Sequence, residues 1–213
     1  SSLRSLLLFD ASHNQLTQWP PRKFDSANMV LEKLYLSSNQ IAEVTADDAA
    51  GAVVMPHVAQ LFLSDNKLTR LVEPWLAPHL TVLHLSGNQL TDVSGLSTCV
   101  ALATLDLSFN QFPEAAPVCR ALASLTRLET LALNDNPFVR DDRERAAALA
   151  FALGALPLLR VYDNDVVSDD VRRAHLRGRL AVPAAQTALA AAIAGGDGGC
   201  DLPGSWLLRA AAP

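Results

Sequence analysis

The residues of this chain best suited to chemistry are a histidine, an aspartate and a series of serines at matching places. His84 and Asp106 each lie two residues before a serine, and the serines recur as Ser12, Ser37, Ser64, Ser86 and Ser108. Together they supply the residue types of a serine hydrolase, a nucleophile with a histidine base. A hydrolase also needs an oriented base, an oxyanion site and a pocket that excludes water. A flat row of serines provides none of these, so we expect no enzyme activity.

No other catalytic or cofactor motif is present. The sequence lacks G-x-x-x-x-G-K-[ST], H-E-x-x-H and paired C-x-x-C motifs, and the GGDGG run near the C-terminus neither follows a strand nor opens a helix. The cysteines Cys99, Cys119 and Cys200 are odd in number and scattered, which matches neither a disulfide framework nor a metal site. We therefore expect no cofactor and no metal ion.

The segments that position His84, Asp106 and the serines are copies of one phrase, LYLSSNQI at residues 34–41. The phrase recurs as LFLSDNKL, LHLSGNQL, LDLSFNQF and LALNDNPF, with a worn first copy, FDASHNQL. Its asparagines align at Asn14, Asn39, Asn66, Asn88, Asn110 and Asn136. Self-similarity with a period of about 20–30 residues marks a solenoid, in which each repeat buries its apolar face against its neighbours. The repeats are therefore expected to stack.

Each Leu-x-Leu segment predicts a short strand whose leucines point into the coil and whose intervening residue points outward. The chain must then turn away from the sheet, which leaves backbone groups facing the interior. An inward asparagine carries both a donor and an acceptor and can satisfy them. We expect the six asparagines to form a structural ladder, in which losing one member costs about 1–3 kcal/mol.

The outward residues form the predicted binding face, the concave side of the solenoid. The central column reads Asp10, Tyr35, Phe62, His84, Asp106, Ala132 and, at the C-terminal end, Arg160. Lys33 and Val82 lie in the neighbouring column. Because adjacent strands lie about 4.8 Å apart, Tyr35, Phe62, Val82 and His84 are expected to form one aromatic and apolar patch, flanked by Asp106 and Lys33. Such a patch is typical of a protein-binding hot spot, although a segment of the same chain could also cover it.

The chain after Asn136 departs from the repeat. Residues 139–157 predict an alanine-rich helix with Asp141 and Asp142 at its start, where carboxylates favour the helix dipole. A last strand-like step is expected at Leu159 and Val161, and a second helix after Ser168 as N-cap. The remaining residues, 181–213, are rich in alanine and glycine and end in Trp206, Leu207 and Leu208.

The repeat pattern L-x-x-L-x-L-x-x-N-x-L resembles that of leucine-rich repeat proteins. The N-P-F, charged-helix and L-P-x-L-x-x-x-D series at residues 136–163 looks like the C-terminal cap of their intracellular members. These members include the regulatory subunit of protein phosphatase one, the A-prime protein of the spliceosomal U-two particle and an axonemal dynein light chain. The resemblance covers about residues 6–180, and Tyr162 departs from it, since the family usually has an aliphatic residue there.

The resemblance implies an α/β fold, a leucine-rich repeat solenoid with a curved parallel sheet on the concave face. Short helices or irregular segments should form the convex face, and helices should cap the C-terminal end. Cys99 stands where the family often has a small buried residue, which implies that it packs inertly in the core. The expected divisions are 1–138 for six repeats, 139–180 for the cap and 181–213 for a tail. In that tail, Trp206, Leu207 and Leu208 are expected to dock on the solenoid or on a partner.

The expected function is that of a non-catalytic scaffold or adaptor subunit, a monomer within a hetero-complex that binds another protein through its concave face. A ribonucleoprotein component and a phosphatase regulatory subunit are the alternatives. A net charge of −5 makes direct nucleic-acid binding an unlikely role, and the cluster Arg172, Arg173, Arg177 and Arg179 fits a solvated helix better than an RNA contact. Without a membrane-span-length apolar run or signal peptide, we expect an intracellular location, cytoplasmic, nuclear or axonemal. The first repeat opens so near the start that an N-terminal cap could be missing.

Overall fold

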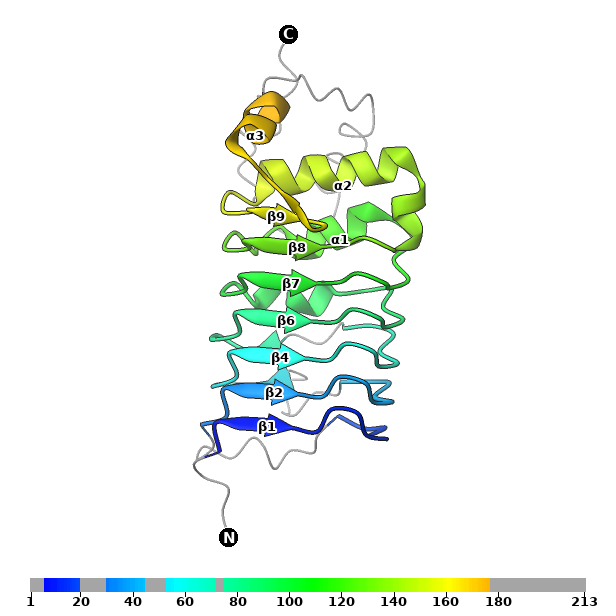
Figure 1. Ribbon diagram of the computed structural model, residues 1–213, viewed down its shortest axis with the longest axis vertical. Helices are drawn as coiled ribbons and strands as arrows, with labels where there is room; N and C mark the ends of the chain where they lie inside the picture. Colours follow the sequence, from blue (N-terminus) through cyan, green and yellow to red (C-terminus); the bar gives the residue numbers. More distant parts are fainter. Residues whose placement is uncertain (1–5, 20–29, 45–52, 72–74, 177–213) are drawn as a thin grey trace.

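The chain folds into an elongated stack of coils, whose main strands lie one above another along the long axis of the molecule (Figure 1). The computed structural model describes residues 6–19, 30–44, 53–71 and 75–176. The main sheet has eight strands among these residues, in the order β1-β2-β4-β6-β7-β8-β9-β10. Its strands are β1 (Leu8–Asp10), β2 (Lys33–Tyr35), β4 (Gln60–Phe62), β6 (Val82–His84), β7 (Thr104–Asp106), β8 (Thr130–Ala132), β9 (Val161–Tyr162) and β10 (Asp165–Val166).

Neighbouring strands of the sheet pair in parallel, except that β10 turns back antiparallel to β9. The register places the repeated leucines side by side, Leu34 with Leu61 and Leu83 with Leu105. The second leucine of each phrase is buried as well, and Leu36, Leu63, Leu85 and Leu107 are fully enclosed. The predicted α/β leucine-rich repeat solenoid is therefore confirmed, and its core is the inward face of this sheet.

The last predicted strand was wrong in register. We expected Leu159 and Val161 to continue the leucine column with Arg160 between them, but the sheet pairs Leu131 with Tyr162 and Thr130 with Val161. Tyr162, the residue that departs from the family pattern, therefore fills the core column and is buried. Leu159 packs in the core before the strand begins. Burial strongly raises the pKa of the Tyr162 hydroxyl, with nearby Asp163 adding to the effect.

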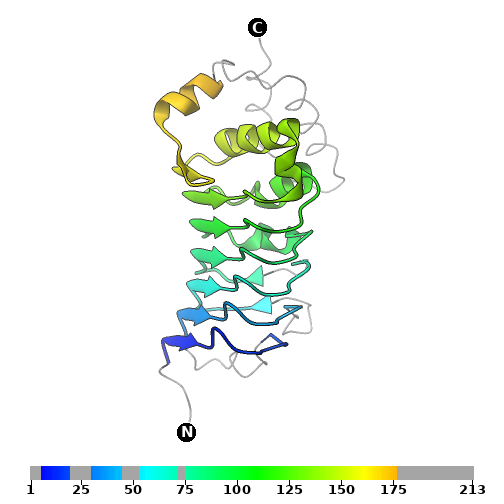
Figure 2. The same cartoon turned by 45° about the vertical axis from the view of Figure 1, so that its right-hand side comes forward.

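The convex side lies opposite the sheet (Figure 2). It holds a second, two-stranded parallel sheet of β3 (Val53–Val54) and β5 (Trp75–Leu76), then the 3₁₀ turn η2 (Ser94–Thr98) and helix α1 (Ala115–Leu122). Trp75 is fully buried, and its ring lies 6.4 Å from that of Trp19. Cys99 and Cys119 are buried free thiols, which confirms the packing role expected of Cys99. The short convex elements agree with the prolines that interrupt these segments.

Two helices close the C-terminal end of the described chain. After the 3₁₀ turn η3 (Pro137–Arg140), α2 (Asp142–Ala155) begins with Asp141, whose carboxylate accepts the amides of Arg143 and Glu144. The second helix, α3 (Asp169–Leu176), is capped by the Ser168 hydroxyl, which accepts the amide of Val171. Both predicted helix starts are confirmed. None of the described helices is long and apolar enough to cross a membrane.

Arg172 connects the two helices. Its guanidinium donates to the carbonyl oxygens of Leu153, Leu156 and Leu159, at 2.7, 3.3 and 2.8 Å, where α2 ends. The last carbonyls of a helix lack amide donors from a following turn, and Arg172 supplies donors there; the Leu156 carbonyl also accepts the amide of Leu159 at 3.2 Å. One member of the predicted basic cluster is thus a structural cap, and Arg173 forms an exposed ion pair with Asp170. Arg177 and Arg179 lie outside the described residues.

Candidate protein-binding face

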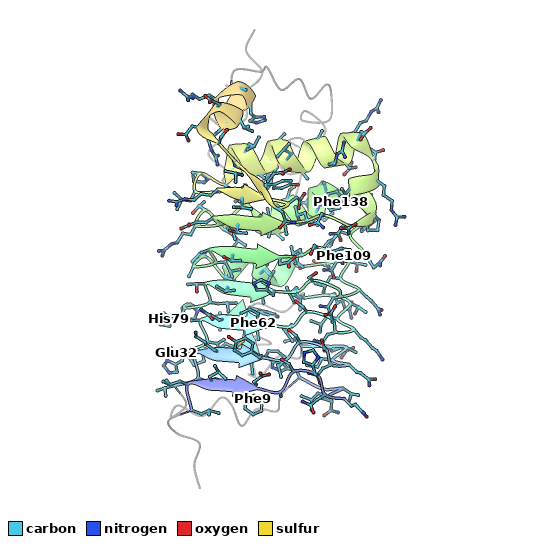
Figure 3. All side chains as sticks on the ribbon, in the orientation of Figure 1. Phe9, Glu32, Phe62, His79, Phe109 and Phe138 are labelled. Atoms are coloured by element: carbon cyan, nitrogen blue, oxygen red, sulfur yellow. The ribbon has the colours of Figure 1, made fainter. Side chains whose placement is uncertain are left out.

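Three rings form a continuous stack on the outward face of β2, β4 and β6. The rings of Tyr35 and Phe62 lie 4.5 Å apart with planes 2° from parallel, and those of Phe62 and His84 lie 5.0 Å apart at 17°. Neighbouring strands place these residues in register, so their spacing follows that of the sheet. All three side chains are half-buried because each covers its neighbour's face. Because the rings cover one another's faces, the stack presents ring edges to solvent; Figure 3 labels its middle member, Phe62.

The stack ends in a charged and hydroxylated network on β6 and β7. His84 Nδ1 lies 3.7 Å from an Asp106 carboxylate oxygen. The other oxygen accepts both the amide of Ser108, at 3.0 Å, and its hydroxyl, at 2.6 Å. Burial alone would raise the pKa of Asp106, but His84 and Ser108 outweigh it and lower the pKa below its usual value. Asp106 is therefore an ionised carboxylate in the middle of the face.

This network does not have the geometry of a serine nucleophile. The Ser108 hydroxyl donates to Asp106, and Ser86 Oγ lies 2.9 Å from Ser108 Oγ. A catalytic serine would instead donate to the histidine that takes its proton. Because Ser108 is also buried, the arrangement holds Asp106 in place and orders the end of β7. The His84, Asp106 and serine set is thus a structural and charge-bearing network.

The remaining predicted face residues divide into two groups. Lys33 and Val82 lie in one outward column with Gln60 between them, as the register requires, and both are half-buried beside the ring stack. Arg160 does not join the central column. It is exposed, lies one position before the strand, and its Nε is 3.8 Å from a Glu129 carboxylate oxygen. Trp206, Leu207 and Leu208 lie outside the described residues.

The asparagine ladder lies just behind this face and fixes its spacing. In each of the five buried copies, Oδ1 accepts an amide from the preceding coil and Nδ2 donates to a carbonyl of each coil, which is a leucine carbonyl in every case except Ala11 O, bonded by Asn39. Asn88, for example, accepts from Leu68 N and donates to Leu63 O and Leu85 O, each at 3.0 Å. Asn39, Asn66, Asn110 and Asn136 repeat this pattern. The ladder is structural, as predicted.

Asn14 is the exception among the six. It is exposed, and its Nδ2 donates only within its own turn, to Ala11 O and Ser12 O at 3.0 and 2.9 Å. No described coil precedes it, and the nearby Leu7, Leu8 and Leu16 are exposed too. Its expected place as a buried ladder member was therefore wrong. The physical reason is that an asparagine of this kind is buried by the coil before it.

A further feature of the face was not predicted from the sequence. The residue before each ladder asparagine adopts the left-handed conformation, and in the successive coils it is His13, Ser38, Asp65, Gly87, Phe109 and Asp135, with φ between 53° and 69°. Small and polar residues tolerate this region, whereas a bulky one there is an outlier. Phe109 is bulky and its side chain is 56% exposed. The sequence signal was available, since SFN stands where the other copies read SHN, SSN, SDN, SGN or NDN.

Comparisons with known proteins agree with the fold and the repeat. The family model for leucine-rich repeats in two copies matches residues 78–117. A chain in the crystal structure of the Drosophila melanogaster SNF/U2A' complex has a similar fold, with a TM-score of 0.51 and 18% identity over 86% of each chain. A leucine-rich repeat protein of Leptospira interrogans is 26% identical, with a TM-score of 0.59, over 75% of this chain and 37% of its own.

A search of curated protein sequences gives no match. The repeats, the parallel sheet with its asparagine ladder and these likenesses define the class of fold: the chain forms a leucine-rich repeat solenoid. Proteins of this class generally serve as non-catalytic interaction modules. Within the class, the fold shared with a chain of the SNF/U2A' complex agrees with the resemblance noted from the sequence.

Proposed function

We propose that this protein is a non-catalytic scaffold or adaptor subunit that binds another protein through its concave face, within a larger intracellular assembly. The observation that carries the proposal is the stack of Tyr35, Phe62 and His84, which ends at the ionised Asp106. Aromatic residues on a rigid surface lose little conformational entropy on binding and dominate interface energies. A sheet whose strands are locked by the asparagine ladder holds them preorganised for a partner.

A pull-down with the Tyr35→Ala/Phe62→Ala variant tests the proposal. The variant removes two neighbouring rings from the middle of the stack and should lose the partner that the unchanged protein recovers. Because the pair is half-buried and stacked, its loss should cost about 0.5–1.5 kcal/mol of stacking in addition to the lost burial of apolar area, and thermal unfolding of the variant checks that the solenoid stays folded. Unimpaired recovery by this variant would refute the concave-face proposal.

A matched control removes exposed apolar side chains from the convex side. Leu76 is 46% and Val100 53% exposed, so Leu76→Ala/Val100→Ala changes apolar surface without touching the stack. This control should keep the partner. A protein that neither variant recovers binds exposed apolar surface non-specifically and is not a partner of the concave face.

The ribonucleoprotein alternative is kept because the SNF/U2A' complex has a chain of similar fold. Under our proposal, the partner stays bound after the lysate is treated with ribonuclease. Release of the partner by ribonuclease would favour the alternative. A phosphatase catalytic subunit in the same pull-down would instead favour the regulatory-subunit function.

A further inference from the structure

The ring stack on β2, β4 and β6 is not covered by any described part of the chain. Between β1 and β7, no described segment crosses the outward face of the sheet (Figure 1). At the end of the stack lies the ionised carboxylate of Asp106, with which no lysine or arginine of the described residues forms an ion pair. A segment that covers this face must therefore be apolar or aromatic over the rings and cationic over β7.

One stretch outside the described residues carries side chains in this order. Trp206 and two leucines are followed directly by Arg209, and Trp206 is the only aromatic residue in the sequence 177–213. A polyproline II backbone turns once in three residues with a rise of about 3.1 Å each, so it would point Trp206 and Arg209 to the same side about 9.3 Å apart. Because β4 and β7 are two strands apart, about 9.6 Å separates them. The spacing therefore places Trp206 over Phe62 when Arg209 meets Asp106.

The chain beyond α3 is long enough to bring this stretch to the face. In both views α3 lies beyond β9 on the strand side of the molecule (Figures 1 and 2). Four strand spacings separate β9 from β4, which is about 19 Å, and the length of α3 adds about 12 Å. Residues 177–205 can span up to about 96 Å, at about 3.3 Å per residue. The distance to the rings is therefore well within reach.

We propose that the tail segment Trp206–Arg209 occupies the concave face of its own chain, and that the protein partner must displace it to bind. The inference rests on the proposed function, because it specifies how access to that same face is controlled. Trp206 and the two leucines cover the ring edges, and Arg209 donates a charge-assisted hydrogen bond to Asp106. A tethered segment acts at an effective concentration that reaches the millimolar range for short linkers, so a weak contact is sufficient to keep the face occupied.

A fluorescent peptide of residues 201–213 tests the contact. The full chain carrying Trp206→Ala/Leu207→Ala/Leu208→Ala, the tail variant, does not occupy its own face and should bind the peptide. The unchanged chain should bind it at least about tenfold more weakly, because its own segment competes. A peptide with the same residues in scrambled order should bind neither chain. Failure of the tail variant to bind the peptide at about millimolar concentration would overturn the proposal.

Substitutions added to the tail variant locate the peptide on the face. Tyr35→Ala/Phe62→Ala should abolish binding, and Asp106→Asn should weaken it about threefold, as expected for a partly exposed ion pair. An Arg209→Ala peptide should then lose nothing further on the Asp106→Asn chain, because the two groups form one contact. The matched control is Leu76→Ala/Val100→Ala on the convex side, which should leave binding unchanged. Equal losses from the face and convex variants would overturn the site.

A nitroxide label on Cys200 shows where the segment lies in the intact chain. Cys99 and Cys119 are buried thiols whose pKa is raised, so the folded chain should take the label at Cys200. We expect paramagnetic broadening of amide signals from β4 and β6 but not from α1 on the convex side, and the tail variant should lose it. Broadening confined to the cap would contradict the proposal. Broadening in an isotope-labelled chain without nitroxide, mixed with the spin-labelled chain, would assign the segment to a second copy and overturn the own-chain contact.

The native partner separates this inference from the proposed function. At equal concentrations, the tail variant should recover at least about threefold more partner than the unchanged chain, because nothing competes for the face. Equal recovery by these two chains, with the partner lost by Tyr35→Ala/Phe62→Ala, overturns the control by the tail and leaves the concave-face function standing. A partner retained by the Tyr35 and Phe62 variant refutes the concave-face function, and loss of the peptide from that same variant then still supports the tail contact.

Discussion

Replacing Asn88 by alanine tests the account of the asparagine ladder most directly. The side chain is 4% exposed and makes three hydrogen bonds of 3.0 Å, one to the amide of Leu68 and two to the carbonyls of Leu63 and Leu85. Both carbonyls also accept a bond from another ladder asparagine, Asn66 for Leu63 and Asn110 for Leu85. After the substitution they each keep one partner, whereas the Leu68 amide loses the one it has.

The magnitude follows from this difference. A buried amide left without a partner costs about 1–3 kcal/mol, and each carbonyl that loses one of two bonds costs less than that. We expect Asn88→Ala to lower the free energy of unfolding by about 2–4 kcal/mol. Urea denaturation measures this change, and the slope of the free energy against urea concentration should stay the same in the variant. Asn88→Asp should cost more at neutral pH, because it sets a carboxylate against two carbonyl oxygens, and should recover stability in acid as the carboxylate is protonated.

Asn14→Ala provides the control, since Asn14 is the same residue type in the same turn but is exposed. Its two bonds, to Ala11 O and Ser12 O, are open to water, so its replacement should cost less than about 1 kcal/mol. The reasoning fails if Asn88→Ala lowers the free energy of unfolding by less than about 0.5 kcal/mol. It also fails if Asn14→Ala lowers it by as much as Asn88→Ala does.

Three further predictions concern groups away from the ladder. Burial raises the pKa of Asp163, so the folded state binds a proton at the Asp163 carboxyl group more tightly than the unfolded state does. The stability that this proton contributes at low pH is therefore lost as pH rises from about 4, where the unfolded carboxyl group titrates, through the higher pKa of the folded state. Asp163→Asn should remove that decline in a urea midpoint series from pH 3.5 to 7, about the range in which carboxyl groups titrate; an unchanged profile would count against it. Arg172→Gln should cost about 1.5–3 kcal/mol by losing charged bonds to the end of α2, against less than about 1 kcal/mol for the exposed Arg173→Gln. Burial raises the pKa of Cys99 to about 12 and that of Cys119 further, so both thiols should react with a thiol reagent only on unfolding; fast labelling of the folded protein would contradict this.

Most of the solenoid could be predicted from the sequence because the same residue types recur at the same positions in each coil. Leucines at alternate positions define the core column, and an inward asparagine after them defines the turn. The stacked outward column of Tyr35, Phe62 and His84 follows from these two facts and the strand spacing, and the structure brings all three together. Because the repeats align with one another, the alignment predicts which residues of neighbouring strands pair.

The parts that the sequence did not predict lie where the period ends. Arg160 was placed by extending the repeat to Leu159 and Val161, but Leu159 packs in the core before the strand begins and Tyr162 occupies the leucine column. Asn14 matched the pattern, but no coil in the described part of the chain lies before it to bury it.

The ladder bonds all run from one coil to the coil before it, so the two ends of the molecule differ. This difference predicts the order in which the strands open. Each buried asparagine ties its own coil to the coil before it, and helices close the C-terminal end, whereas the described N-terminal coil keeps an exposed Asn14 and three exposed leucines. In a solenoid with nearest-neighbour coupling, the end with the fewest such ties opens first. Amide hydrogens of β1 should therefore exchange with solvent before those of β2, and β6 and β7 should exchange last, so the ring stack loosens from Tyr35 toward His84.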